Sequence, residues 1–130
     1  MILLDTDICI DIIRGRDTAL IDRLATAEDA VLAISSITLA ELEFGAANSS
    51  DPERNHLAVT LFASAFDIVP FDSRHVRTYG EIRTYLSRKG MMIGPHDLQI
   101  AAQALSEGMM VMTRNMREFS RIPGLIICKS

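Results

Sequence analysis

Residues 1–15 read MILLDTDICIDIIRG, and this stretch decides the fold. Ile2–Leu4 is a short apolar run that ends at an acid, Asp5, as a buried strand does at the edge of a sheet. Residues 8–13 form a second apolar run, which predicts a helix. A strand that passes directly into a helix is typical of an α/β fold, and it places Asp5 at the junction.

The same alternation of short apolar runs with longer amphipathic ones continues along the chain. It predicts further strands over 30–34, 67–70, 109–112 and 125–128, and helices over 18–27, 35–47, 52–66, 72–85 and 97–106. Strands that alternate with helices imply a parallel sheet with helices on both faces. We therefore expect a single α/β domain over residues 1–130.

Composition and charge limit the classes of function. Hydrophobic residues make up 48% of the 130 residues, which is enough for a core, and the net charge of −4 argues against a broad, non-specific nucleic-acid binder. No apolar run has transmembrane length and no secretory signal is visible, so we expect a cytoplasmic protein that does not contact the membrane. Cys9 and Cys128 are expected to be buried and unpaired, because cytoplasmic disulfides are rare.

Acidic residues far apart in the sequence fall at one edge of the expected sheet. Asp5 follows the first strand, Glu41 lies in the first two turns of the helix after the second strand, and Asp97 opens the helix before the fourth strand. Asn115 and Glu118 follow the fourth strand. Because ligands bind beyond the carboxyl ends of parallel strands, we expect these side chains to gather there.

Clustered carboxylates favour magnesium, which prefers oxygen ligands and keeps several waters. One or two such ions can activate water, neutralise a scissile phosphate and stabilise the leaving oxygen, so no protein nucleophile is needed. Crowded carboxylates repel one another, and without a cation at least one of them is expected to have a raised pKa. The pattern therefore predicts a bound divalent cation at this edge.

Each acid also has an ordinary structural explanation. Glu41 has the spacing of a capping box with Thr38, and Asp97 could simply cap its helix or favour the positive end of that helix. Glu118 could pair with a surface arginine. Asp5 is the least ordinary, because it directly follows a buried strand.

Four segments in order resemble the PIN-domain ribonucleases, in particular the VapC-type toxins of bacterial toxin–antitoxin pairs. They are LDTDICIDIIRGR (4–16), ISSITLAELEFGA (34–46), IGPHDLQIAAQAL (93–105) and MTRNMREFSRIPGL (112–125). Together they span nearly the whole chain. The resemblance implies a three-layer α/β/α fold with a central, mainly parallel sheet, and endonucleolytic cleavage of RNA by metal-activated water.

The resemblance also implies ligands and partners. Asp5 and Asp97 would hold Mg²⁺ or Mn²⁺, with Glu41 assisting. The RNA substrate would be structured, as transfer RNA is, and a cognate VapB-type antitoxin would inhibit a homodimeric toxin. Many PIN domains have an aspartate where Asn115 stands, so the fourth member of the site is either Asn115 or Glu118.

Two other functions stay open at this point. Asp5-Thr6-Asp7 after an apolar strand fits the D-x-D nucleophile motif of haloacid-dehalogenase phosphatases, although Lys89 and Lys129 are poorly placed for the lysine that this family needs. The other is a catalytically weak PIN-like protein that only binds a partner or nucleic acid. Asn115, which carries no charge, keeps that second alternative open.

Overall fold

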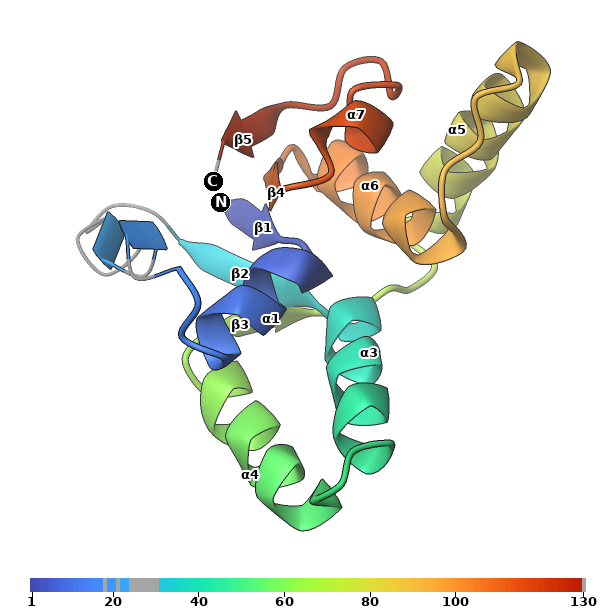
Figure 1. The fold of residues 1–130 in the computed structure, drawn as a ribbon. Helices are drawn as coiled ribbons and strands as arrows, with labels where there is room; N and C mark the ends of the chain where they lie inside the picture. Colours follow the sequence, from blue (N-terminus) through green and yellow to red (C-terminus); the bar gives the residue numbers. More distant parts are fainter. Residues whose placement is uncertain (18, 21, 24–30, 130) are drawn as a thin grey trace.

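The computed structural model describes residues 1–17, 19–20, 22–23 and 31–129. Over these residues the strands are β1 (Ile2–Leu4), β2 (Leu32–Ser35), β3 (Asp67–Val69), β4 (Met110–Thr113) and β5 (Ile127–Lys129). The helices are α1 (Thr6–Ile13), α3 (Ser36–Ala47), α4 (Pro52–Ala63), α5 (Val76–Lys89), α6 (Pro95–Glu107) and α7 (Met116–Phe119). The predicted α/β fold is confirmed (Figure 1).

The strands form one parallel sheet in the order β3-β2-β1-β4-β5, with β1 at its centre. Leu4, the last residue of β1, lies opposite Ile34 of β2 and Met112 of β4. The carboxyl ends of the three central strands therefore stop together. Residues that directly follow them, beginning with Asp5, meet at one edge.

Helices cover both faces of the sheet (Figure 1). Successive side chains of a strand point to opposite faces, and β1 divides the core in this way. Leu3 packs in a cluster with Leu86 of α5 and Ile100 of α6. Leu4 packs in the other cluster with Ile8 of α1 and Leu42 of α3. The sheet is thus the middle one of three layers.

Strand β2, which lies between β1 and the edge strand β3, offers a test of this packing. Ile34 is fully buried, whereas its register partner on the edge strand β3, Ile68, is 38% exposed. We expect Ile34→Val to lower the free energy of unfolding by about 1 kcal/mol, because it removes one buried methylene group. Ile68→Val should change it much less. Urea unfolding of both variants measures the difference, and equal losses would contradict the assigned burial.

Some predicted boundaries are wrong. The helix expected over 72–85 begins instead at Val76, because Asp72 forms a turn in which its Oδ1 accepts the Arg74 N–H and its own N–H donates to His75 Nδ1. That helix ends at Gly90, which adopts a left-handed φ of 66°. Most of the helix expected over 18–27 lies outside the described residues, and so does residue 30, where the second strand was expected to begin.

The described residues also bear on the cysteines and on membrane contact. Cys9 is buried as predicted, but Cys128 is only half-buried, and neither forms a disulfide. Within the described part of the chain, no helix has both the length and the apolar character needed to cross a bilayer.

Candidate active site

Asp5 is buried at the carboxyl end of β1, where its side chain caps α1. Its Oδ1 accepts a hydrogen bond from the Thr6 N–H at 2.8 Å, and its Oδ2 accepts one from Thr113 Oγ1 at 2.8 Å. Burial is the main cause that raises the pKa of Asp5 to about 6, and the negative charges of Asp7 and Glu41 add to it. The carboxylate is thus held rigidly by polar partners in a place that disfavours its charge.

Asp97 lies in the first turn of α6 and contacts the segment after β4. Asn115 Nδ2 donates to Asp97 Oδ2 at 3.3 Å and to Glu118 Oε2 at 2.8 Å. Glu118 also accepts the N–H of Gly94, the residue that begins α6. The amide of Asn115 therefore bridges two carboxylates that are 21 residues apart in the sequence.

The pKa of Asp97 is raised to about 7, chiefly by burial, with smaller contributions from the charge of Asp5 and the contact with Glu118. The pKa of Glu118 is lowered, chiefly by a hydrogen bond from Asp97. Of these two neighbouring carboxyl groups, Asp97 is therefore the one that takes up a proton more readily. Because the charge of Asp5 contributes to the raised pKa of Asp97, these two acids lie close enough to repel each other.

Glu41 joins the same edge from α3. Its Oε1 lies 3.2 Å from Thr6 Oγ1 and 3.2 Å from His96 Nδ1. Thr6 Oγ1 also lies 3.1 Å from Thr38 Oγ1. Glu41 therefore contacts the residues that adjoin Asp5 and Asp97 rather than either acid directly.

The capping explanations for two of these acids are wrong. The N-cap of α3 is Ser35, whose side chain accepts from the Ile37 N–H, so Thr38 and Glu41 do not form a capping box at the helix start. The N-cap of α6 is Gly94, and no side chain caps that helix, so Asp97 is not a cap. Neither carboxylate has a capping role, although Asp97, in the first turn of α6, does lie at the positive end of that helix.

All the sequence-predicted site residues lie at the carboxyl edge of the sheet, namely Asp5, Glu41, Asp97, Asn115 and Glu118. Sequence reasoning missed the hydroxyl groups that contact the acids, those of Thr6 at Glu41 and Thr113 at Asp5. One signal could have found Thr113, because it ends the apolar run of β4 in the way that Asp5 ends that of β1.

Asp7 lies outside this group. Its Oδ1 accepts the Ile8 N–H at 2.7 Å and its Oδ2 accepts the Arg114 N–H at 3.2 Å. The Arg114 side chain forms ion pairs with Asp11 at 2.6 Å and Asp17 at 2.7 Å. These contacts fasten the loop that carries Asn115 to α1 and to the residues that follow α1.

The donor set suits a hard divalent cation with few protein ligands. Among the described residues, no three His, Cys, Asp or Glu side chains are arranged as a ready-made metal-binding group. Mg²⁺ needs no such group, because it binds through one or two carboxylates together with waters and substrate phosphates. A cation between Asp5 and Asp97 would stabilise the charged forms of both carboxylates, which burial chiefly disfavours. The residues therefore fit Mg²⁺ or Mn²⁺.

The parallel α/β fold and the acids at the carboxyl edge of its sheet fit a metal-dependent nuclease domain, and comparison with known families agrees. Residues 2–125 match the family model described as PIN domain. The chain belongs to the PIN-domain family and, within it, to the VapC-type ribonucleases. The haloacid-dehalogenase alternative is therefore not retained.

Particular relatives are similar over nearly their whole length. "Ribonuclease VapC2" of Rickettsia felis is 40% identical over 126 residues, which are 96% of this chain and 94% of the relative. The "tRNA(fMet)-specific endonuclease VapC" of Salmonella typhimurium is 42% identical over 125 residues, with the same coverage of 96% and 94%.

Solved structures give the same result. The VapBC2 complex of Rickettsia felis, bound to a DNA fragment from its promoter, contains a chain that matches with a TM-score of 0.92 and 38% identity, covering 99% of this chain and 98% of that one. The DNA-bound VapBC of Salmonella typhimurium matches with a TM-score of 0.92 and 41% identity, covering 98% and 96%.

Proposed function

We propose that this chain is a divalent-metal-dependent endoribonuclease that acts as the toxin of a type II toxin–antitoxin pair and cuts structured RNA such as transfer RNA. The observation that carries the proposal is the pair of carboxylates, Asp5 and Asp97, whose pKa values are both raised at one edge of the sheet. A protein that only binds a partner has no need to hold repelling acids together.

Asp5 and Asp97 are the residues that would hold the metal ion, Mg²⁺ or Mn²⁺. The bound ion supplies a lowered pKa for water and a positive charge at the scissile phosphate. Thr113 and the Thr6 N–H orient Asp5 through the two hydrogen bonds that its oxygens accept. These bonds leave Asp5 in one orientation before any substrate arrives, which lowers the cost of reaching the reactive geometry.

The other site residues have separate roles in the proposal. Glu41, close to His96, is placed to accept a proton from the attacking water. Asn115 orients Asp97 and Glu118 through its amide N–H groups, and Glu118 supplies the fourth negative charge of the edge. In this proposal Asn115 positions a carboxylate and Glu118 takes the place of the aspartate that many PIN domains have.

The partners are a cognate VapB-type antitoxin and a second copy of the chain in a cytoplasmic homodimer. The relatives named as complexes with VapB support the antitoxin. A groove of about 410 Å³ between α1, α3 and α4 is lined by Ile10, Ile13 and Leu42 and reaches Glu41. An apolar antitoxin segment in this groove would end beside the site, so it could block the entry of RNA.

Cleavage of a transfer-RNA pool tests the proposed activity. The purified protein should cut transfer RNA in MgCl₂ and lose this activity in EDTA, and Mn²⁺ should restore it. A pool of unstructured RNA of the same length is the matched substrate control. Equal cleavage with and without the chelator would reject the metal requirement, and no cleavage by a well-folded protein would favour the binding-only alternative.

A further inference from the structure

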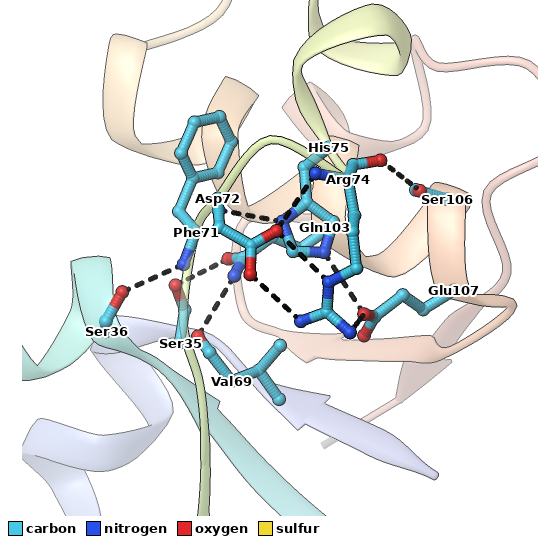
Figure 2. A network of polar contacts seen from close by, with 10 residues as sticks. All are labelled: Ser35, Ser36, Val69, Phe71, Asp72, Arg74, His75, Gln103, Ser106 and Glu107. Atoms are coloured by element: carbon cyan, nitrogen blue, oxygen red, sulfur yellow. Dashed lines mark hydrogen bonds and ion pairs between the residues drawn. The ribbon is translucent and has the colours of Figure 1, made fainter.

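Gln103 is a fully buried amide that the proposed catalysis does not use. It lies on α6, six residues after Asp97, among alanines that are also fully buried. A buried amide costs free energy unless its donor and its acceptor both find partners. Ser35 Oγ donates to Gln103 Oε1, and Gln103 Nε2 donates to the Val69 carbonyl oxygen at 3.0 Å, as Figure 2 shows. Gln103 therefore joins α6 to the last residues of two strands.

Ser35 connects this amide to the helix that carries Glu41. Ser35 is the last residue of β2 and the N-cap of α3, and its Oγ accepts the Ile37 N–H at 3.0 Å. An N-cap side chain fixes where a helix begins and in which direction it leaves the strand. Glu41 follows within the first two turns, so a shift at Ser35 moves Glu41.

The segment over residues 71–75 makes a second connection between the same helices (Figure 2). The Phe71 N–H donates to Ser36 Oγ, in the first turn of α3, at 3.1 Å. His75 is fully buried, and its Nε2 lies 3.1 Å from Glu107 Oε1, in the last turn of α6. The start of α3 and the second half of α6 are thus held together through the buried hydrogen bonds of Gln103 and the partly buried contacts of the segment over residues 71–75.

We propose that Gln103 is a positioning residue for the carboxylate site, which holds α6 with Asp97 at a fixed place relative to α3 with Glu41. The inference rests on the proposed function. Gln103 acts through Ser35 and the helix backbones and contacts no substrate. Residues behind metal ligands typically change metal affinity or activity by 10- to 100-fold when they are lost.

The test is Gln103→Met, which keeps the volume and removes both hydrogen bonds. We expect the Kd for Mn²⁺, measured by isothermal titration calorimetry on the RNA-free protein, to rise about tenfold. We expect kcat for RNA cleavage to fall about tenfold while KM stays within about twofold of the wild type, because positioning acts on the transition state rather than on RNA binding. Ser35→Ala removes the same contact from the other side and should give the same pattern.

Three matched variants separate positioning from stability. Gln103→His keeps one donor and one acceptor, so it should retain most of the Mn²⁺ affinity and kcat. Gln99→Met makes the same exchange four residues earlier on α6 and should leave both unchanged. Val59→Ala removes buried surface from the opposite core cluster, so it lowers the melting temperature without touching this network.

The inference is overturned if Gln103→Met binds Mn²⁺ and turns over like the wild type. It is also overturned if Val59→Ala reproduces the loss of Mn²⁺ affinity, because the effect would then follow stability alone. A wild-type protein that cuts no RNA would defeat the proposed function instead. In that event the Mn²⁺ titration still decides the role of Gln103.

Discussion

Asp5→Asn is expected to reduce kcat/KM for RNA cleavage by roughly 10³-fold, and Asp97→Asn by a similar factor, because each removes a ligand for an ion that contributes several kcal/mol of transition-state stabilisation. The amide has the size of the carboxylate and can still contact Thr6 and Thr113, so the local geometry survives the exchange. Single-turnover cleavage of transfer RNA at saturating Mg²⁺ measures the effect.

The matched control for this prediction is Asp67→Asn. Asp67 is an exposed aspartate at the amino end of β3, so it lies away from the carboxyl edge where the site is. Its replacement should leave cleavage unchanged. In the metal-free protein at neutral pH, Asp5→Asn should raise the melting temperature, because it removes a charge that burial disfavours. Loss of stability together with activity would instead point to a structural role for Asp5.

Stability of the metal-free protein is expected to fall as the pH rises from about 4.5 to about 7. In the folded state the pKa of Asp5 is raised from 3.8 to about 6 and that of Asp97 to about 7. The folded protein therefore binds more protons than the unfolded chain in this window, and its free energy of unfolding decreases with pH. Glu118 and Asp72 have lowered pKa values, so their contribution is lost only at lower pH.

Mg²⁺ should reverse this trend. At a concentration of 100 times its Kd, a ligand adds about 2.7 kcal/mol, which is roughly 10 °C in the melting temperature of a domain of this size. The shift should be large at pH 7.5 and small at pH 5.0, where Asp5 and Asp97 are protonated and bind poorly. Differential scanning calorimetry at both pH values measures it, with KCl at matched ionic strength as the control. Equal shifts at the two pH values, or an undiminished shift in Asp5→Asn, would contradict the assignment.

The part of the site that the sequence predicted is the part that local patterns encode. The apolar run of β1 ends at Asp5, and the parallel topology then places Asp5 beside the residues after β2 and β4. The apolar periodicity over 97–106 likewise placed Asp97 at the start of the helix before the fourth strand. These inferences need only hydrophobic periodicity and the rule that parallel strands end at one edge.

The part that it did not predict depends on partners from distant elements. Nothing near Thr6 in the sequence indicates that its hydroxyl lies beside Glu41, 35 residues later. Gln103 was not singled out from the sequence, because its partner Ser35 is 68 residues away. The start of α5 was misplaced for a different, local reason, because the apolar periodicity does not reveal the turn in which the Asp72 N–H donates to the ring of His75 three residues later.

The most direct test of the central claim is an anomalous difference map from crystals grown or soaked with Mn²⁺. The claim is that acids from separate segments meet at one edge of the sheet to hold a divalent ion. It predicts one dominant peak with oxygen ligands from both Asp5 and Asp97. A map in which bound Mn²⁺ contacts neither aspartate would contradict it.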